Sequence, residues 1–89
     1  MEEIIVHPRI HERHPEISEQ DVLDAWNGCI RSVPRLAENT GEVVVLGCDA
    51  KGRLVEMVAK RLDASSWLVF HALTPPTKKT LVELGLRGR

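Results

Sequence analysis

The stretch VVVLGCDAKGRLVEMVAKRLDASSWLVFHAL, residues 43–73, decides the fold. Its apolar and β-branched runs, at 43–48, 53–62 and 67–73, are separated by short polar turns. The turn at 49–52 begins with Asp and ends with Gly, the preferences of a type I turn. The sequence therefore predicts three consecutive strands joined as an antiparallel meander.

The segment upstream of the meander has the pattern of a helix. Ser18 suits the N-cap and Asp21 gives a weaker form of the capping box. Apolar residues then recur at the spacing of one buried helical face, at Val22, Ala25, Trp26, Cys29 and Ile30. We therefore expect a helix that begins at Ser18 and continues through Ile30.

Shorter elements are predicted on both sides of these segments. Residues 4–6 favour a short strand, and about two helical turns fit between Pro8 and Pro15. Residues 31–36 fit an edge strand followed by a turn cluster at 38–41. The segments near the end of the chain predict a helix after 74–77, with Leu81, Val82 and Leu84 as its apolar stripe and Gly85 as its stop.

These elements together predict an α+β domain that spans residues 1–89. Its order is a short strand, two helices, three or four antiparallel strands and a last helix. We expect the helices to cover one face of the sheet and to leave the other face open to solvent.

Composition narrows the classes of function only slightly. Hydrophobic residues make up 43% of the chain, and 12 basic residues oppose 13 acidic ones. The net charge of −1 gives no general attraction to nucleic acid or membranes. The acidic N-terminus lacks a signal-peptide pattern, so we expect a cytoplasmic protein. Cys29 and Cys48 lie in apolar segments and are expected to be buried thiols without a bridge.

Two groups of residues resemble a known toxin family. The run His7-x-Arg9-x3-Arg13, followed by Ile17-Ser18-x2-Asp21-Val22-x2-Ala25, resembles the opening of the BrnT-like toxins and their relatives. The runs Val44-x2-Gly47-x-Asp49-x2-Gly52-Arg53 and Val69-x-His71-Ala72 fit the meander of the same family. The resemblance covers about residues 5–73. That family is similar to the RelE and ParE toxin superfamily.

The resemblance implies a RelE-like α+β toxin fold. It also implies a ribonuclease that cleaves messenger RNA without a metal or cofactor, and a cognate antitoxin protein as partner. Cleavage of this kind requires a base for the ribose 2′-OH, cations for the phosphorane and a proton for the leaving oxygen. Imidazole and lysine move protons, and guanidinium groups bind phosphate oxygens.

The meander offers catalytic candidates. Alternation along the strands predicts Val55, Met57 and Ala59 on the core side of the middle strand. Leu68, Phe70 and Ala72 form the more apolar side of the last strand, so His71 is expected on the open face. Glu56 and Lys60 are expected to point outward with His71, and Arg53 and Arg61 are expected near the edges of this face. Our catalytic candidates are Lys60, Arg61 and His71. A single bulge would exchange Lys60 for Arg61.

Other basic residues are candidates for binding RNA phosphate. They are Arg9 and Arg13 on the first helix, Arg53 at the edge of the meander, and Lys78 and Lys79 in the first turn of the last helix. A bound phosphate would favour cations at that helix end, which otherwise oppose the helix dipole. For each of these residues, an ordinary solvated side chain is the competing interpretation.

The histidines His7, His11 and His14 raise the question of a metal. Spacings of four and seven residues place them on one face of a helix, where two histidines can share a metal. A zinc site normally needs a third or fourth ligand, and no Cys-x-x-Cys pattern exists. We therefore expect no metal ligand set.

Three functions remain open from the sequence. The first is the toxin-type endoribonuclease, which the grouping of Lys60, Arg61 and His71 favours. The second is a non-catalytic binding module on the same fold, which the near-neutral charge favours. The third is a small metal-binding protein that uses the histidines.

Overall fold

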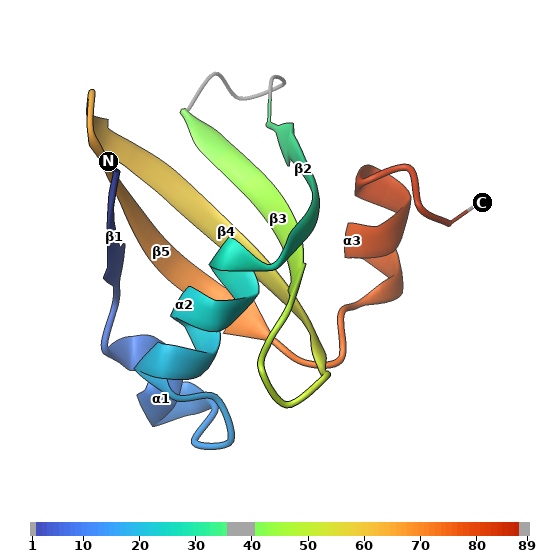
Figure 1. The fold of residues 1–89 in the computed structure, drawn as a ribbon. Coiled ribbons are helices and arrows are strands. Elements are labelled where there is room, and N and C mark those ends of the chain that lie inside the picture. The colour runs from blue at the N-terminus through green and yellow to red at the C-terminus, as the bar shows by residue number, and fades with distance from the viewer. Residues whose placement is uncertain (1, 36–40, 88–89) are drawn as a thin grey trace.

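The computed structural model describes residues 2–35 and 41–87, and its centre is one five-stranded sheet (Figure 1). The order across the sheet is β1-β5-β4-β3-β2. Strand β1 pairs with β5 in parallel, and all other neighbours are antiparallel. The strands are β1 (Glu3–Val6), β2 (Cys29–Pro34), β3 (Glu42–Cys48), β4 (Leu54–Asp63) and β5 (Ser66–Leu73). The predicted α+β class and the β3–β4–β5 meander are confirmed.

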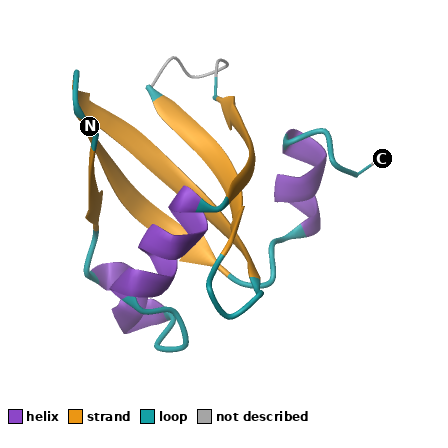
Figure 2. Ribbon diagram, in the orientation of Figure 1, coloured by secondary structure: helices purple, strands orange, loops and turns teal. Residues whose placement is uncertain are grey.

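The three helices lie on two faces of the sheet. Helix α2 (Glu19–Asn27) covers one face, and α3 (Lys78–Glu83) lies against the other (Figure 2). Helix α1 (Arg9–Arg13) packs Ile10 into the core on the α2 side, while its Arg9 reaches the Phe70 carbonyl oxygen of β5. The prediction that all helices share one face is therefore wrong. Its physical reason is a second apolar patch, where Leu84 packs against Val44 and Leu46 of β3. No helix within the described ranges is long and apolar enough to cross a membrane.

Helix α2 ends earlier than its apolar pattern predicts. It stops at Asn27, and Gly28 joins the sheet by accepting a hydrogen bond from the Cys48 backbone N–H at 3.1 Å. A side chain at Gly28 would collide with the carbonyl group of Cys48, so the chain can approach β3 here only with glycine. Cys29 and Ile30 consequently belong to β2 and are exposed, which corrects their predicted burial.

Strand β2 forms one edge of the sheet and has two interruptions. Its pairing with β3 changes register between Cys29 and Arg31, and Pro34 at its end has no N–H to donate. The strand starts two residues before the predicted start. Leu36 and the predicted turn residues 38–40 lie outside the described residues.

The main core lies between α1, α2 and the sheet. Val22 and Ala25 of α2 and Ile10 of α1 pack with Met57 and Val69 from the central strands. Gly47 allows α2 to lie directly on β3, because a Cβ at this position would collide with the backbone of Ala25. The alternation predicted for Val55, Met57 and Ala59 is confirmed, since all three are fully buried.

The predicted N-cap of α2 is present as a complete capping box. Ser18 Oγ accepts a hydrogen bond from the Asp21 N–H at 3.0 Å, and Asp21 Oδ2 accepts from the Ser18 N–H at 2.9 Å. We expect Ser18→Ala to lower the free energy of unfolding by about 1 kcal/mol, the usual worth of such a cap. Urea unfolding measures this loss. An unchanged midpoint would show that the cap does not stabilise α2.

Candidate functional site

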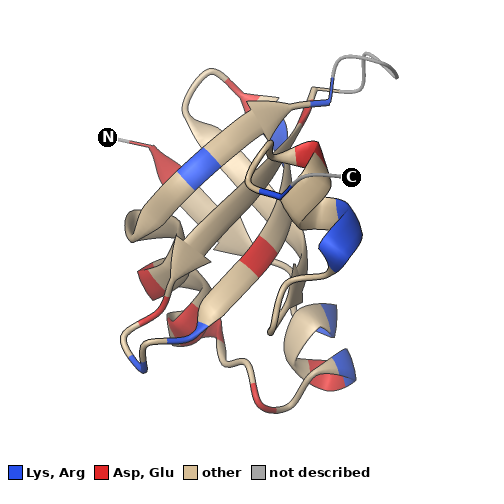
Figure 3. Cartoon of the chain, turned by 90° about the vertical axis from the view of Figure 1, so that its right-hand side faces the viewer, with Lys and Arg blue, Asp and Glu red and all other residues tan. Residues whose placement is uncertain are grey.

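A shallow hollow on the α3 side of the sheet gathers several of the predicted residues. Its volume is about 270 Å³, and it is lined by Arg9, Arg13, Arg35, Val58, Phe70 and His71. We call it the basic hollow. Arg9 and Arg13 lie one turn apart on α1, as their spacing predicts, and His71 comes from β5. Figure 3 views the molecule from this side and shows basic segments on α1 and α3 around the strands.

A β-bulge shapes the floor of the basic hollow. Val58 pairs with His71 and Ala59 pairs with Val69, so Phe70 has no partner in β4. Consecutive residues of a regular strand point to opposite faces, whereas at a bulge this alternation fails. Phe70 and His71 therefore line the same hollow although they are neighbours in the sequence.

The bulge also corrects the predicted alternation of β5. Ala72 is paired with Met57 and belongs to the main core, but Leu68 is paired with Lys60 on the opposite face. Leu68, Phe70 and Ala72 thus do not form one apolar side. The irregularity beside Val58 adds its extra residue to β5, so it does not exchange Lys60 for Arg61 on β4.

Glu56 and His71 form a hydrogen-bonded pair at the edge of the basic hollow. The distance between His71 Nε2 and Glu56 Oε2 is 2.8 Å. The Glu56 side chain is 6% exposed and also accepts hydrogen bonds from the N–H and the hydroxyl of Thr77, just before α3. The prediction that Glu56 shares a face with His71 is confirmed, but the carboxylate is buried rather than solvated.

The charge of Glu56 determines the orientation of the imidazole. Burial raises the pKa of Glu56, but the hydrogen bonds from His71 and Thr77 outweigh burial and lower the pKa to about 2. The carboxylate is therefore ionised at neutral pH and can only accept hydrogen bonds. His71 Nε2 must then carry the proton, which leaves Nδ1 of a neutral ring free to accept one. With a side chain 39% exposed, His71 is accessible to a ligand.

Arg35 is a member of the basic hollow that the sequence interpretation did not select. Its Nε donates to Glu83 Oε2 of α3 at 3.0 Å, and its Nη1 lies 3.5 Å from Glu42 Oε1. These carboxylates hold the guanidinium at the rim and partly neutralise it. The sequence contains no local signal for this position, because Arg35 and Glu83 are 48 residues apart.

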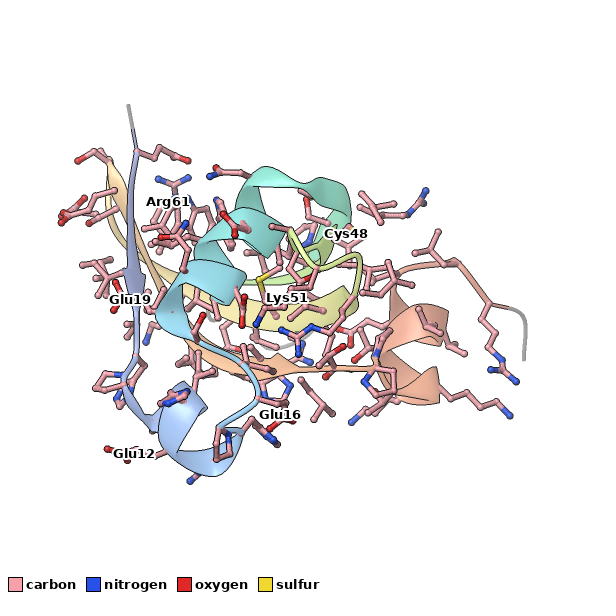
Figure 4. The ribbon with its side chains drawn as sticks, turned by 60° about the horizontal axis from the view of Figure 1, so that its bottom comes forward. Glu12, Glu16, Glu19, Cys48, Lys51 and Arg61 are labelled. Atoms are coloured by element: carbon pink, nitrogen blue, oxygen red, sulfur yellow. The ribbon has the colours of Figure 1, made fainter. Side chains whose placement is uncertain are left out.

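The predicted catalytic group of three is not assembled as expected. Lys60 is exposed and lies on the same face of β4 as Val58, but it does not line the basic hollow. Arg61 points to the opposite face, where its guanidinium carbon lies 4.2 Å from the centre of the Trp67 ring and its Nη2 pairs with Glu2. Figure 4 shows Arg61 at the β1 side, away from α3. The expectation that Arg61 lies near the edge of the face that carries His71 is therefore wrong.

Arg53 also lies away from the basic hollow. It pairs with Asp49 Oδ2 at 2.8 Å and with Asp21 Oδ2 at 3.1 Å. Lys51, labelled in Figure 4, pairs with Asp21 as well. These ion pairs tie the turn after β3 to the start of α2. The expectation that Arg53 lies near the edge of the face that carries His71 is therefore wrong, and its contacts are those of a structural residue.

The other predicted basic residues lie near the site without forming its lining. Lys78 and Lys79 occupy the first turn of α3, as expected, and are exposed. Neither lines the basic hollow.

The histidines near the N-terminus do not share one helical face. Helix α1 includes only His11, because His7 precedes it and His14 is its C-cap. His7 Nδ1 accepts from the Arg9 N–H, and His11 Nδ1 lies 2.9 Å from the Ile17 carbonyl oxygen. Among the described residues, no three His, Cys, Asp or Glu side chains are placed to hold a metal ion. This geometry does not favour the metal-binding alternative.

The residues that the sequence interpretation missed share a common reason. Glu56 was placed on the correct face but received no role, and Arg35 and Phe70 received none. Long-range contacts and a bulge bring them to the site, and neither feature leaves a pattern in neighbouring residues. The only signal in the sequence for these three positions was the residue type itself: a carboxylate, a guanidinium and an aromatic ring.

Comparisons of the chain with protein-family models, with curated proteins and with solved structures found no match. The resemblance to the BrnT-like toxins therefore stays an expectation.

Proposed function

We propose that this protein is a metal-independent endoribonuclease of the toxin type that cleaves messenger RNA at the basic hollow. One observation carries the proposal: His71, oriented by a buried and ionised Glu56, stands beside Arg9, Arg13 and Arg35. Attack of a ribose 2′-OH on the adjacent phosphodiester requires a general base for the hydroxyl proton and cations that stabilise the phosphorane. An imidazole next to a cluster of guanidinium groups supplies both. The toxin assignment further implies an antitoxin as partner.

The proposed chemistry follows from the roles of these side chains. His71 Nδ1 takes the proton from the ribose 2′-OH while the O2′ atom attacks phosphorus. Arg13 and Arg35 bind the non-bridging oxygens, whose negative charge grows in the phosphorane. The bond to the 5′-oxygen then breaks, and solvent water protonates this oxygen. The products are a 2′,3′-cyclic phosphate and a free 5′-hydroxyl.

The direct test is the chemistry of the cleaved ends. Purified protein is incubated with single-stranded RNA in the presence of EDTA, and the ends are identified by mass spectrometry. The proposal expects cyclic phosphate and 5′-hydroxyl ends, together with growth arrest when expression is induced in cells. Intact RNA and normal growth, with the protein folded, would contradict the endoribonuclease.

Phosphate binding has its own expected signature. We expect Arg13→Gln to weaken binding of RNA of any sequence and to make the slope of log K against log salt concentration shallower by about 1. Fluorescence anisotropy at several salt concentrations measures this slope. Lys51→Gln is the matched control, because Lys51 pairs with Asp21 on the other side of the sheet. An equal change in both variants would show a general charge effect.

A non-catalytic RNA-binding module is the second candidate. Two observations favour it: Arg35 is already paired with two carboxylates, and Arg61 is absent from the basic hollow. RNA binding that requires Arg13, without cleavage under the conditions above, would support this candidate over the first.

A further inference from the structure

The basic hollow contains an aromatic ring that phosphate binding alone does not explain. Phe70, the single phenylalanine of the chain, is half-buried and forms an apolar floor together with the buried Val58. Guanidinium groups and N–H donors alone are sufficient to bind an anion such as phosphate. A ligand that matches the whole hollow has an anionic part and a flat apolar part.

The Phe70 side chain is held in place by its neighbours. Arg9 Nε donates to the main-chain carbonyl oxygen of Phe70 at 3.1 Å, and the guanidinium carbon of Arg9 lies over the Phe70 ring, 5.7 Å from its centre. The bulge removes the β4 partner of Phe70, so the ring lies beside His71 rather than in the main core. An aromatic side chain that is held next to the His71 imidazole is a preorganised surface on which another flat ring can stack.

The size of the hollow limits what it can accept. Small-molecule sites usually measure roughly 300–1,000 Å³, and the basic hollow, at about 270 Å³, lies just below this range. It therefore suits one nucleotide unit rather than a length of duplex. A base inside a duplex has its faces covered by neighbouring bases, whereas an unpaired base can leave the strand and stack on protein.

We propose that the basic hollow contains a base-stacking subsite, in which one unpaired base of an RNA strand lies against the Phe70 ring while its phosphate faces Arg13 and Arg35. This inference rests on the proposed function and adds the class of ligand: single-stranded nucleic acid, recognised by stacking. Arg9 then acts chiefly as the residue that positions Phe70.

The test compares two strands of equal charge. One probe is a fluorescent hexamer of 2′-O-methyl uridine, which cannot be cleaved because its 2′-oxygen is blocked, and the other is a 2′-O-methyl hexamer of abasic units. We expect wild-type protein to bind the uridine strand about tenfold more tightly, as stacking of one base on an aromatic ring typically gives. Phe70→Leu should remove this difference, and Phe70→Trp should keep it.

The controls separate this subsite from phosphate binding and from folding. Arg13→Gln should weaken both strands by the same factor, and circular dichroism shows whether each variant remains folded. If Phe70→Leu does not fold, the preference of the wild-type and Phe70→Trp proteins for the uridine strand over the abasic strand still tests the stacking subsite. Equal binding of the two strands by wild-type protein overturns the stacking inference, as does an unchanged preference in folded Phe70→Leu.

The result also separates this inference from the proposed function. Cleavage of RNA that depends on His71, without preference for the uridine strand, would reject the stacking subsite and leave the endoribonuclease intact. A preference that depends on Phe70, without any cleavage, would support the subsite and reject the endoribonuclease.

Discussion

Replacing His71 by alanine is expected to lower the rate of RNA cleavage by about 100- to 10,000-fold, the usual contribution of a general base. The reason is that His71 is the imidazole that lines the basic hollow and has its Nε2 bound by an ionised carboxylate. Single-turnover cleavage of a labelled RNA measures the loss, and induced expression of the variant should no longer arrest growth.

The matched control for this substitution is His14→Ala. His14 is also partly exposed, but it lies at the end of α1 and pairs with Glu16 at 3.9 Å, outside the basic hollow. We expect its cleavage rate to stay within about twofold of wild type. A folded His71→Ala protein that cleaves RNA as fast as the control would remove His71 from the mechanism.

Replacing Glu56 by alanine is expected to have the largest effect on stability. The substitution leaves the N–H of Thr77 and Nε2 of His71 without their acceptor, which costs about 1–3 kcal/mol. For a domain of this size the melting temperature should fall by about 4–8 °C for each kcal/mol. Glu12→Ala, at an exposed position of α1, is the control and should change stability by less than about 0.5 kcal/mol.

The pH dependence of stability gives an independent test of the same contact. The pKa of Glu56 is lowered from 4.5 to about 2 in the folded protein, so the unfolded chain binds this proton more readily. The stabilisation is therefore present above about pH 4.5 and is lost as the pH falls towards 2. Asp21, whose pKa also falls to about 2, contributes in the same window in both proteins. The free energy of unfolding of wild type minus that of Glu56→Gln should thus decrease with acid, and a constant difference would contradict this contact.

The sequence predicted the local parts of this fold well. Strands β3 and β4 begin or end within one residue of their expected bounds, because alternation and turn residues are local signals. The capping box of α2 was likewise readable from Ser18 and Asp21. The parallel pairing of β1 with β5 was not predicted, since partners 63 residues apart, such as Glu3 and Ser66, leave no pattern along the chain.

The candidate site was predicted only in part. Arg9, Arg13 and His71 meet in one hollow, whereas Arg53 and Arg61 pair with carboxylates on the other side of the sheet. His71 faces the expected side, but the alternation that led to this expectation fails at Phe70. One extra residue in β5 reverses the face of the sheet to which all later residues of the strand point. The number of apolar residues in the strand does not reveal this bulge.

The interrupted edge strand β2 has a consequence for how copies of this chain meet in concentrated solution. An uninterrupted edge offers a row of free N–H and C=O groups that can template the growth of fibrils. The register change after Cys29 and the missing N–H of Pro34 break that row at both ends of β2. The exposed Ile30 thus lies on an edge where an incoming strand finds too few consecutive partners, which makes β2 a poor template for a further strand.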